Sequence, residues 1–302
     1  MIAEESLQLD LVLAFCAIIT LSGCAFIAGR KVCRSERGSV SQWSFVCTIL
    51  LTLVFCWKFH AKLSWANAIP FSSVVFWSNL APVMLAFATG MAMEITSLRR
   101  STRPWIVGTL GLLGTAYLVM PIARPWILTP SIAPSDQFNG LVCLQSHDAT
   151  CAAASAVTLL KLHGIKSSEK EMVRACLTSE LGTEALGLYR GLKIASQKHD
   201  RSVRLASRNP QQWLSSGQLP NVALVHFPET EFGPIDRDDL SMATVPAKSQ
   251  FYGDPQQEGH AVVVLGHEDG QWLVADPAIG LVKWSDRSMN FRFTGDAIYI
   301  SD

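Results

Sequence analysis

Four long apolar runs fill the first 128 residues of this 302-residue chain, at residues 7–29, 43–59, 71–93 and 105–123. A helix needs about 20 mostly apolar residues to cross the hydrocarbon core of a bilayer, and these runs meet or approach that length. We therefore expect residues 1–128 to form an all-α bundle of about four transmembrane helices, with three spans as the main competing interpretation.

Details within the runs agree with membrane helices. Tryptophans cluster near the ends of the runs, as they do at membrane interfaces: Trp43, Trp57, Trp65, Trp105 and Trp126. In the third run, Asn79 lies close to Pro82 and marks either a packing contact or a functional polar contact, of which we favour packing. No series of ionisable residues crosses the runs, so we expect an anchor and not a transporter.

The loop charges predict an orientation. Seven basic residues fall in the first and third loops and three on the opposite side: Arg30, Lys31, Arg34, Arg37, Arg99, Arg100 and Arg103 against Lys58, Lys62 and Arg124. Basic loops favour the cytoplasm, so four spans place the amino terminus and residues 140–302 outside the cell. An error of one span would reverse this. The acidic start of the chain excludes a cleavable signal peptide.

The rest of the chain has a different composition. Prolines in residues 129–139 predict an extended linker, and residues 140–302 read as an ordinary soluble domain. The net charge of zero argues against nucleic-acid binding, and no nucleotide-binding motif occurs. Neither the cysteines nor the histidines have metal-ligand spacing, so we expect no metal and no cofactor. A disulfide between Cys143 and Cys176 is conceivable but not favoured.

Cys151 opens an alanine-rich run that ends at Gly164 and predicts a helix. Asp148 and Thr150 are both plausible caps ahead of it. The unpaired amides and the dipole of a helix's first turn favour an anion, which suits a nucleophilic thiolate. Gln145, six residues earlier, can supply a second donor to a developing oxyanion. From the helix alone, a buried structural cysteine is an equally good interpretation.

A predicted hairpin carries two further candidate residues, His260 and Asp276. The β-type runs 259–266 and 271–276 flank the turn residues 266–270. If the hairpin is centred on Glu268, His260 and Asp276 face each other, and the carboxylate would orient the imidazole. A loop of two or four residues would put them on opposite faces. A thiol, an imidazole, a carboxylate and an amide donor are the parts of a papain-like nucleophile site.

Other segments are weaker signals. We expect helices near 167–176 and 185–198 and a strand at 221–227, followed by a long loop at 228–258 that we interpret as a partial lid. Four other histidines of this half, His147, His163, His226 and His267, are more typical of loop, helix-end and strand positions.

The segments 143–164, 182–200 and 259–280 resemble the bacteriocin-processing, double-glycine-leader cysteine peptidases, which are papain-like domains of ABC exporters. The resemblance covers roughly residues 140–300. It implies that Cys151 is the nucleophile, His260 the base, Asp276 its orienting residue and Gln145 the oxyanion donor. Three features depart from the family: Ala152 replaces its usual glycine, the 228–258 loop is longer, and the membrane runs precede the domain with no ATPase after it.

These observations predict an α+β domain, with helices packed on an antiparallel sheet, behind a transmembrane bundle. The predicted function is a membrane-anchored cysteine peptidase that cleaves a peptide or protein substrate after a small pair such as Gly-Gly. Its partners would be the lipid bilayer and a separate exporter. Two alternatives stay open: a cysteine acyltransferase, and a non-catalytic leader-binding or sensing module on a membrane tether.

Overall fold

The computed structural model of this chain describes residues 2–35, 38–96, 98–226 and 259–301. The chain forms two compact units. One comprises Met1–Trp65 and Ser73–Arg124, and the other comprises Ala66–Ser72 and Pro125–Asp302. The loop predicted at 228–258 lies outside the described residues.

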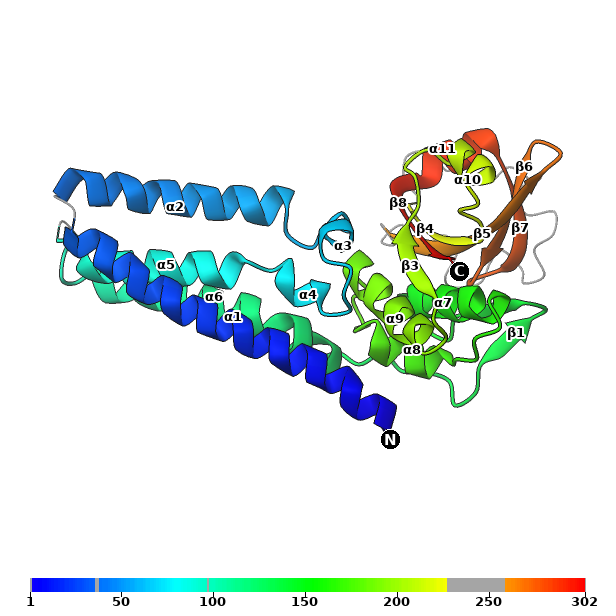
Figure 1. The fold of residues 1–302 in the computed structure, drawn as a ribbon, viewed down its shortest axis with the longest axis horizontal. Coiled ribbons are helices and arrows are strands. Elements are labelled where there is room, and N and C mark those ends of the chain that lie inside the picture. The colour runs from blue at the N-terminus through cyan, green and yellow to red at the C-terminus, as the bar shows by residue number, and fades with distance from the viewer. Residues whose placement is uncertain (1, 36–37, 97, 227–258, 302) are drawn as a thin grey trace. The chain divides into compact units, whose positions relative to one another are not determined.

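Long helices build the first unit (Figure 1). They are α1 (Ile2–Ser35), α2 (Gly38–Lys58), α5 (Ala81–Glu94) and α6 (Arg103–Ile127). Two helices of one turn lie between α2 and α5: α3 (Trp65–Ala68), at the boundary of the two units, and α4 (Val74–Trp77). Within the described part of the chain, four segments are apolar and long enough to cross a membrane: Leu9–Ser35, Ser39–Lys58, Val74–Glu94 and Arg103–Ile127. Their positions agree with the four runs in the sequence.

Two glycines let α1 and α5 approach each other closely. A Cβ atom added at Gly29 would collide with the carbonyl oxygen of Phe87, and one added at Gly90 would collide with that of Phe26. At the end of this contact, Glu94 accepts hydrogen bonds from Arg30 Nε at 2.7 Å and Arg34 Nη2 at 2.9 Å. Small residues at a crossing allow such backbone proximity between apolar helices.

The third apolar segment is interrupted, a feature that the run of apolar residues did not predict. Helix α4 ends at Trp77, and α5 begins at Ala81 with Pro82 in its first turn. A proline is tolerated there because the amide that it lacks has no intrahelical partner. The buried Asn79 lies in the break and donates from Nδ2 to the carbonyl of Tyr117 at 2.6 Å. This bond ties the break to α6, as expected of a packing contact.

The second unit combines helices with an antiparallel sheet, as expected for an α+β domain. Its strands are β1 (Gln137–Asn139), β2 (Val142–Leu144), β3 (Ser202–Leu205), β4 (Asn221–Val225), β5 (His260–Glu268), β6 (Gln271–Asp276), β7 (Gly280–Ser285) and β8 (Phe293–Ser301). The first two form a small hairpin, and the others form one sheet in the order β3-β8-β4-β5-β6-β7.

Helices cover this sheet from both sides (Figure 1). On one side lie α7 (Cys151–Leu162), α8 (Glu169–Ala175) and α9 (Ala185–Gln197); on the other lie α10 (Gln211–Ser215) and α11 (Asp286–Arg292). Ser168 and Glu171 form a reciprocal capping box at the start of α8, and Gly164 has a positive φ of 73° just after α7. Both signals are present in the sequence.

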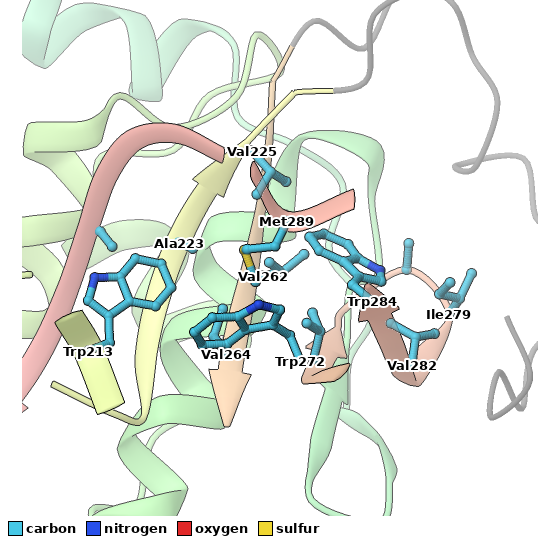
Figure 2. Close-up of a cluster of buried hydrophobic side chains, with 13 residues drawn as sticks. Trp213, Ala223, Val225, Val262, Val264, Trp272, Ile279, Val282, Trp284 and Met289 are labelled. Carbon is cyan, nitrogen blue, oxygen red and sulfur yellow. The ribbon is translucent and has the colours of Figure 1, made fainter. Parts of the chain in front are cut away.

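A tryptophan-rich core holds α10 and α11 against the sheet (Figure 2). Trp213 of α10, Trp272 of β6 and Trp284 of β7 are fully buried there, together with Met289 of α11. Trp213 meets Trp272 edge to face, with ring centroids 5.8 Å apart. Aromatic side chains of this size bury large apolar areas, so this cluster fixes the strands that lead to the end of β6.

The predicted linker belongs to the second unit, and it and the preceding Leu128 are hydrogen-bonded to other parts of that unit. The carbonyl of Leu128 accepts from Glu180 N at 2.7 Å, and Ala133 N donates to Ser146 Oγ at 3.2 Å. Asp136 Oδ1 accepts from Glu169 N at 3.1 Å. Partners far along the chain therefore bind backbone and side-chain groups of this segment.

Candidate active site

Cys151 is the first residue of α7 and is half-buried. A short 3-10 helix, η1 (Asp148–Thr150), leads directly into α7, and His147 caps it. Thr150 is the N-cap residue of α7, one of the two predicted, but its side chain makes no cap bond to α7 and instead exchanges hydrogen bonds with His147. The amides in the first turn of α7 therefore receive no side-chain acceptor from Thr150.

His260 and Asp276 are brought together in the second unit. His260 Nε2 lies 2.9 Å from Asp276 Oδ1, and the two side chains are 2% and 0% exposed. The same carboxylate oxygen accepts the amide of Ala278 at 2.8 Å. A carboxylate can only accept, so Nε2–H is the donor and Nδ1 is the nitrogen left to face another group.

A β-bulge produces this pairing. Asp269 and Gly270 form a two-residue turn with positive φ angles, so the hairpin is not centred on Glu268 as predicted. With such a turn alone, His260 and Asp276 would lie on opposite faces. The register shifts between Val264 and Gly266, and this shift returns them to the same face. His260 and Asp276 consequently meet diagonally across the ladder, which suits a long side chain.

The ionisation of His260 depends on its two neighbours. Burial of the ring acts to lower its pKa, but the charge and hydrogen bond of Asp276 oppose this, and those of Cys151 add to the increase. Together they raise the pKa of His260 from 6.5 to about 10. The imidazole is therefore an imidazolium at neutral pH, held between a carboxylate and the thiol at the start of α7.

Ser155 joins the helix of Cys151 to the strand of His260. It lies one helical turn after Cys151, on the same face of α7. Its buried hydroxyl donates to the carbonyl of Ala261, the residue after His260, at 2.8 Å. Sequence reasoning missed this contact, because a serine in an alanine-rich helix carries no signal of its distant acceptor.

Gln145 lies just after β2 and is 6% exposed. Its backbone N–H donates to the carbonyl of Pro277, the residue after Asp276, at 2.8 Å. Its side-chain Nε2 donates to the carbonyl of His147 at 3.2 Å. A carboxamide nitrogen carries two hydrogens, so one remains for a further acceptor.

The other two cysteines of this unit differ sharply from Cys151. Cys143 and Cys176 are buried and free, so the conceivable disulfide between them does not form. Burial is the main reason that the pKa of each thiol is raised to about 12. Both therefore stay protonated thiols at neutral pH.

The remaining histidines have other surroundings. His147 Nδ1 accepts the amide of Ala149 as the cap of η1, and His226 Nδ1 lies 3.0 Å from the carbonyl of Arg292. His267, at the far end of β5 from His260, lies 3.3 Å from Asp286. Burial and then the charge of Arg201 lower the pKa of His163. Among the residues that the structure describes, no three His, Cys, Asp or Glu side chains gather as metal ligands.

No protein-family model and no curated protein matches the chain. Several solved structures are similar to about half of it. The peptidase domain of Streptococcus ComA, a bi-functional ABC transporter of a quorum-sensing pathway, is 18% identical over 52% of this chain and 95% of its own, with a TM-score of 0.37.

A double glycine motif protease from an AMS/PCAT transporter, solved with its leader peptide, is 18% identical over 56% of this chain and 95% of its own, with a TM-score of 0.38. The peptidase domain of Streptococcus mutans ComA is 18% identical over 54% of this chain and 100% of its own, with a TM-score of 0.34. Likeness at this level assigns no activity to the chain.

Proposed function

We propose that this chain is a membrane-anchored cysteine peptidase with Cys151 as nucleophile, His260 as acid and base, Asp276 as the residue that orients His260, and Gln145 as an oxyanion donor. One observation carries the proposal: His260 and Asp276 form a buried pair, and Cys151, at the start of a helix, helps to raise the pKa of the His260 imidazole. An imidazolium beside a thiol favours the thiolate, which is the reactive form.

The proposed reaction follows from these positions. The thiolate of Cys151 attacks the carbonyl carbon of a peptide bond, and the carbonyl oxygen becomes an oxyanion. Amides in the first turn of α7 and the second hydrogen of Gln145 Nε2 stabilise this oxyanion. His260 then donates its Nδ1 proton to the departing amine, leaving a thioester on Cys151. Water, deprotonated by His260, adds to the thioester and releases the acid.

Membrane anchoring is part of the same proposal. The four apolar segments supply the anchor, and their outward-facing side chains include Leu13, Leu51, Trp57 and Leu112, each more than half exposed in the structure. The charge distribution of the loops favours the peptidase unit outside the cell. A topology reporter fused after residue 302 tests this: an outside signal supports the assignment, and a cytoplasmic signal overturns it.

For the substrate, the resemblance of residues 140–300 to leader peptidases favours a peptide cleaved after a small pair such as Gly-Gly. The test uses the full chain in nanodiscs with a panel of peptides that carry small-residue pairs. Cys151→Ala is the inactive control, and Cys143→Ala is the matched control that removes a thiol elsewhere. We expect cleavage that only Cys151→Ala abolishes. Failure of the wild type to cleave any such peptide would contradict the peptidase assignment.

Including amines and thiols as acceptors in that assay distinguishes hydrolysis from acyl transfer. The half-exposed Cys151 is reachable by either acceptor, so the ratio of free acid to amide or thioester product decides between them. A predominance of transfer product would replace peptidase by acyltransferase while keeping the same nucleophile.

A further inference from the structure

Glu169 is a buried carboxylate with no role in the reaction proposed above. It is the first residue of α8 and only 1% exposed. Its Oε1 accepts the amide of Ser146 at 2.9 Å, and its own amide donates to Asp136 Oδ1 at 3.1 Å. Burying a charged carboxylate is unfavourable unless hydrogen bonds compensate it, so this position needs an explanation.

Ser146 directly follows Gln145 and belongs to the short loop that ends at Cys151. The backbone amides of the first three residues of this loop, Gln145 to His147, are all hydrogen-bonded. The Gln145 amide is bonded to Pro277, the Ser146 amide to Glu169, and the His147 amide to Thr150 Oγ1. Ser146 Oγ also accepts from Ala133 of the linker.

These bonds constrain the side chain that matters for the oxyanion. The bonds to Pro277 and Glu169 fix the backbone on both sides of the Gln145 carbonyl. A donor to an oxyanion works only when its hydrogen is in place before the charge develops, and a displacement of about 1 Å can cost ~10²-fold in rate. The bond to Glu169 is charge-assisted and therefore stronger than the neutral ones.

We propose that Glu169 is a positioning residue: by accepting the Ser146 amide, it holds the Gln145 carboxamide where it can donate to the oxyanion. This inference rests on the proposed function of Cys151. Two properties of the site then depend on different residues. Thiolate formation depends on His260 and Asp276, whereas oxyanion stabilisation depends on Gln145 and, through Ser146, on Glu169.

Two reagents separate these properties in the full chain. Iodoacetamide alkylates the Cys151 sulfur with loss of iodide and forms no oxyanion. A peptide aldehyde ending in glycinal adds the sulfur to its carbonyl carbon, and the S–H proton passes to the carbonyl oxygen, which occupies the oxyanion position. Alkylation rates therefore report the thiolate, and competition by the aldehyde reports the oxyanion pocket.

We expect Glu169→Ala to weaken aldehyde binding by about 10–100-fold while changing the alkylation rate by less than about twofold. Glu169→Gln keeps a carbonyl oxygen for the Ser146 amide and should recover most of the binding. The matched control is Glu171→Ala, which removes an exposed carboxylate two residues along the same helix. It weakens the cap of α8 without touching Ser146 and should leave both reagents unaffected.

Three results from the variants that do bind less aldehyde or alkylate more slowly would overturn the positioning role. They are an equal fall in alkylation and aldehyde binding, a Glu169→Gln variant as impaired as Glu169→Ala, or a Glu171→Ala variant that reproduces the Glu169→Ala defect. A wild type that binds no aldehyde contradicts the proposed function itself and removes the role of Glu169 with it. A wild type that binds aldehyde, alongside a Glu169→Ala variant that binds it equally well, contradicts only the role of Glu169.

Discussion

Replacing Asp276 by Asn removes one negative charge beside His260 while keeping the size of the side chain and a carbonyl oxygen for the Ala278 amide. Asp276 is the main source of the raised pKa of His260, and burial of the ring acts in the opposite direction. Without Asp276 we therefore expect the pKa of His260 to fall from about 10 toward its ordinary value of 6.5.

The consequence for reactivity can be worked out at pH 8. A group with a pKa of about 10 is about 99% protonated there, whereas one with a pKa of 6.5 is about 3% protonated. A pKa of 6.5 would leave ~30-fold less imidazolium at pH 8, and if that charge supports the Cys151 thiolate, Asp276→Asn should slow alkylation of Cys151 there. The assay is NMR titration of the full chain carrying ¹³C-labelled histidine, with the His260 signal assigned through His260→Gln.

Two controls sharpen this titration. Cys151→Ala should lower the pKa of His260 less than Asp276→Asn does, because Asp276 contributes more to the increase. His163, whose pKa is lowered by burial and by Arg201, should titrate unchanged in both variants. The reasoning is refuted if wild-type His260 titrates near 6.5, or if Asp276→Asn leaves its midpoint in place.

The buried pair of His260 and Asp276 also makes the free energy of unfolding depend on pH. Removing one partner of a buried ion pair lowers that free energy by about 3–5 kcal/mol. Since folding raises the pKa of His260, its stabilising effect is complete below pH 6.5 and disappears as the pH rises through about 10. Asp276→Asn should therefore destabilise most near pH 6 and least above pH 10. Pulsed thiol labelling of the buried Cys143 and Cys176 against denaturant concentration measures the difference.

Three further predictions follow from packing and burial. Ser155→Ala removes the bond to the Ala261 carbonyl and should lower the free energy of unfolding of the second unit by about 1–3 kcal/mol, again by thiol labelling; an unchanged midpoint would contradict the role of that bond. Gly90→Ala places a Cβ against the carbonyl of Phe26 and should lower the thermal stability of the first unit in detergent, whereas Gly111→Ala, with no atom within 4 Å of the added Cβ, should not. Dithionitrobenzoate should modify Cys151 at least ~100-fold faster than Cys143 or Cys176 in the native chain, because those two thiols are buried and have pKa values of about 12. Peptide mass mapping measures the three rates, and comparable rates would argue against an activated Cys151.

Local signals in the sequence predicted much of the second unit. The alanine-rich run and Gly164 delimited α7, and a helix was expected near 167–176, where α8 lies, because a helix start and end depend mainly on neighbouring residues. The hairpin was also evident, but its register was not. Gly266, at the end of the first β-type run, was an available sign of a bulge, but the expected register was obtained by counting residues across the loop without it.

Contacts between distant residues could not be predicted in this way. Glu169 reads as an ordinary acidic residue in the first turn of a helix, and nothing near it in sequence indicates that Ser146 is its partner. The linker showed its prolines but not its hydrogen bonds to Ser146 and Glu169. The break in the third apolar segment was signalled by Pro82, yet an apolar run records only hydrophobicity, so α4 and α5 were expected as one helix.

The central claim, that Cys151 forms a covalent acyl intermediate with the help of His260, has a direct test. The full chain is mixed with an activated ester of a small-residue peptide, quenched in acid, and mapped by mass spectrometry. The account predicts one acyl group, carried by Cys151, that is absent in Cys151→Ala and formed much more slowly in His260→Ala. An adduct that forms equally well without His260, or that appears on another cysteine instead, would contradict it.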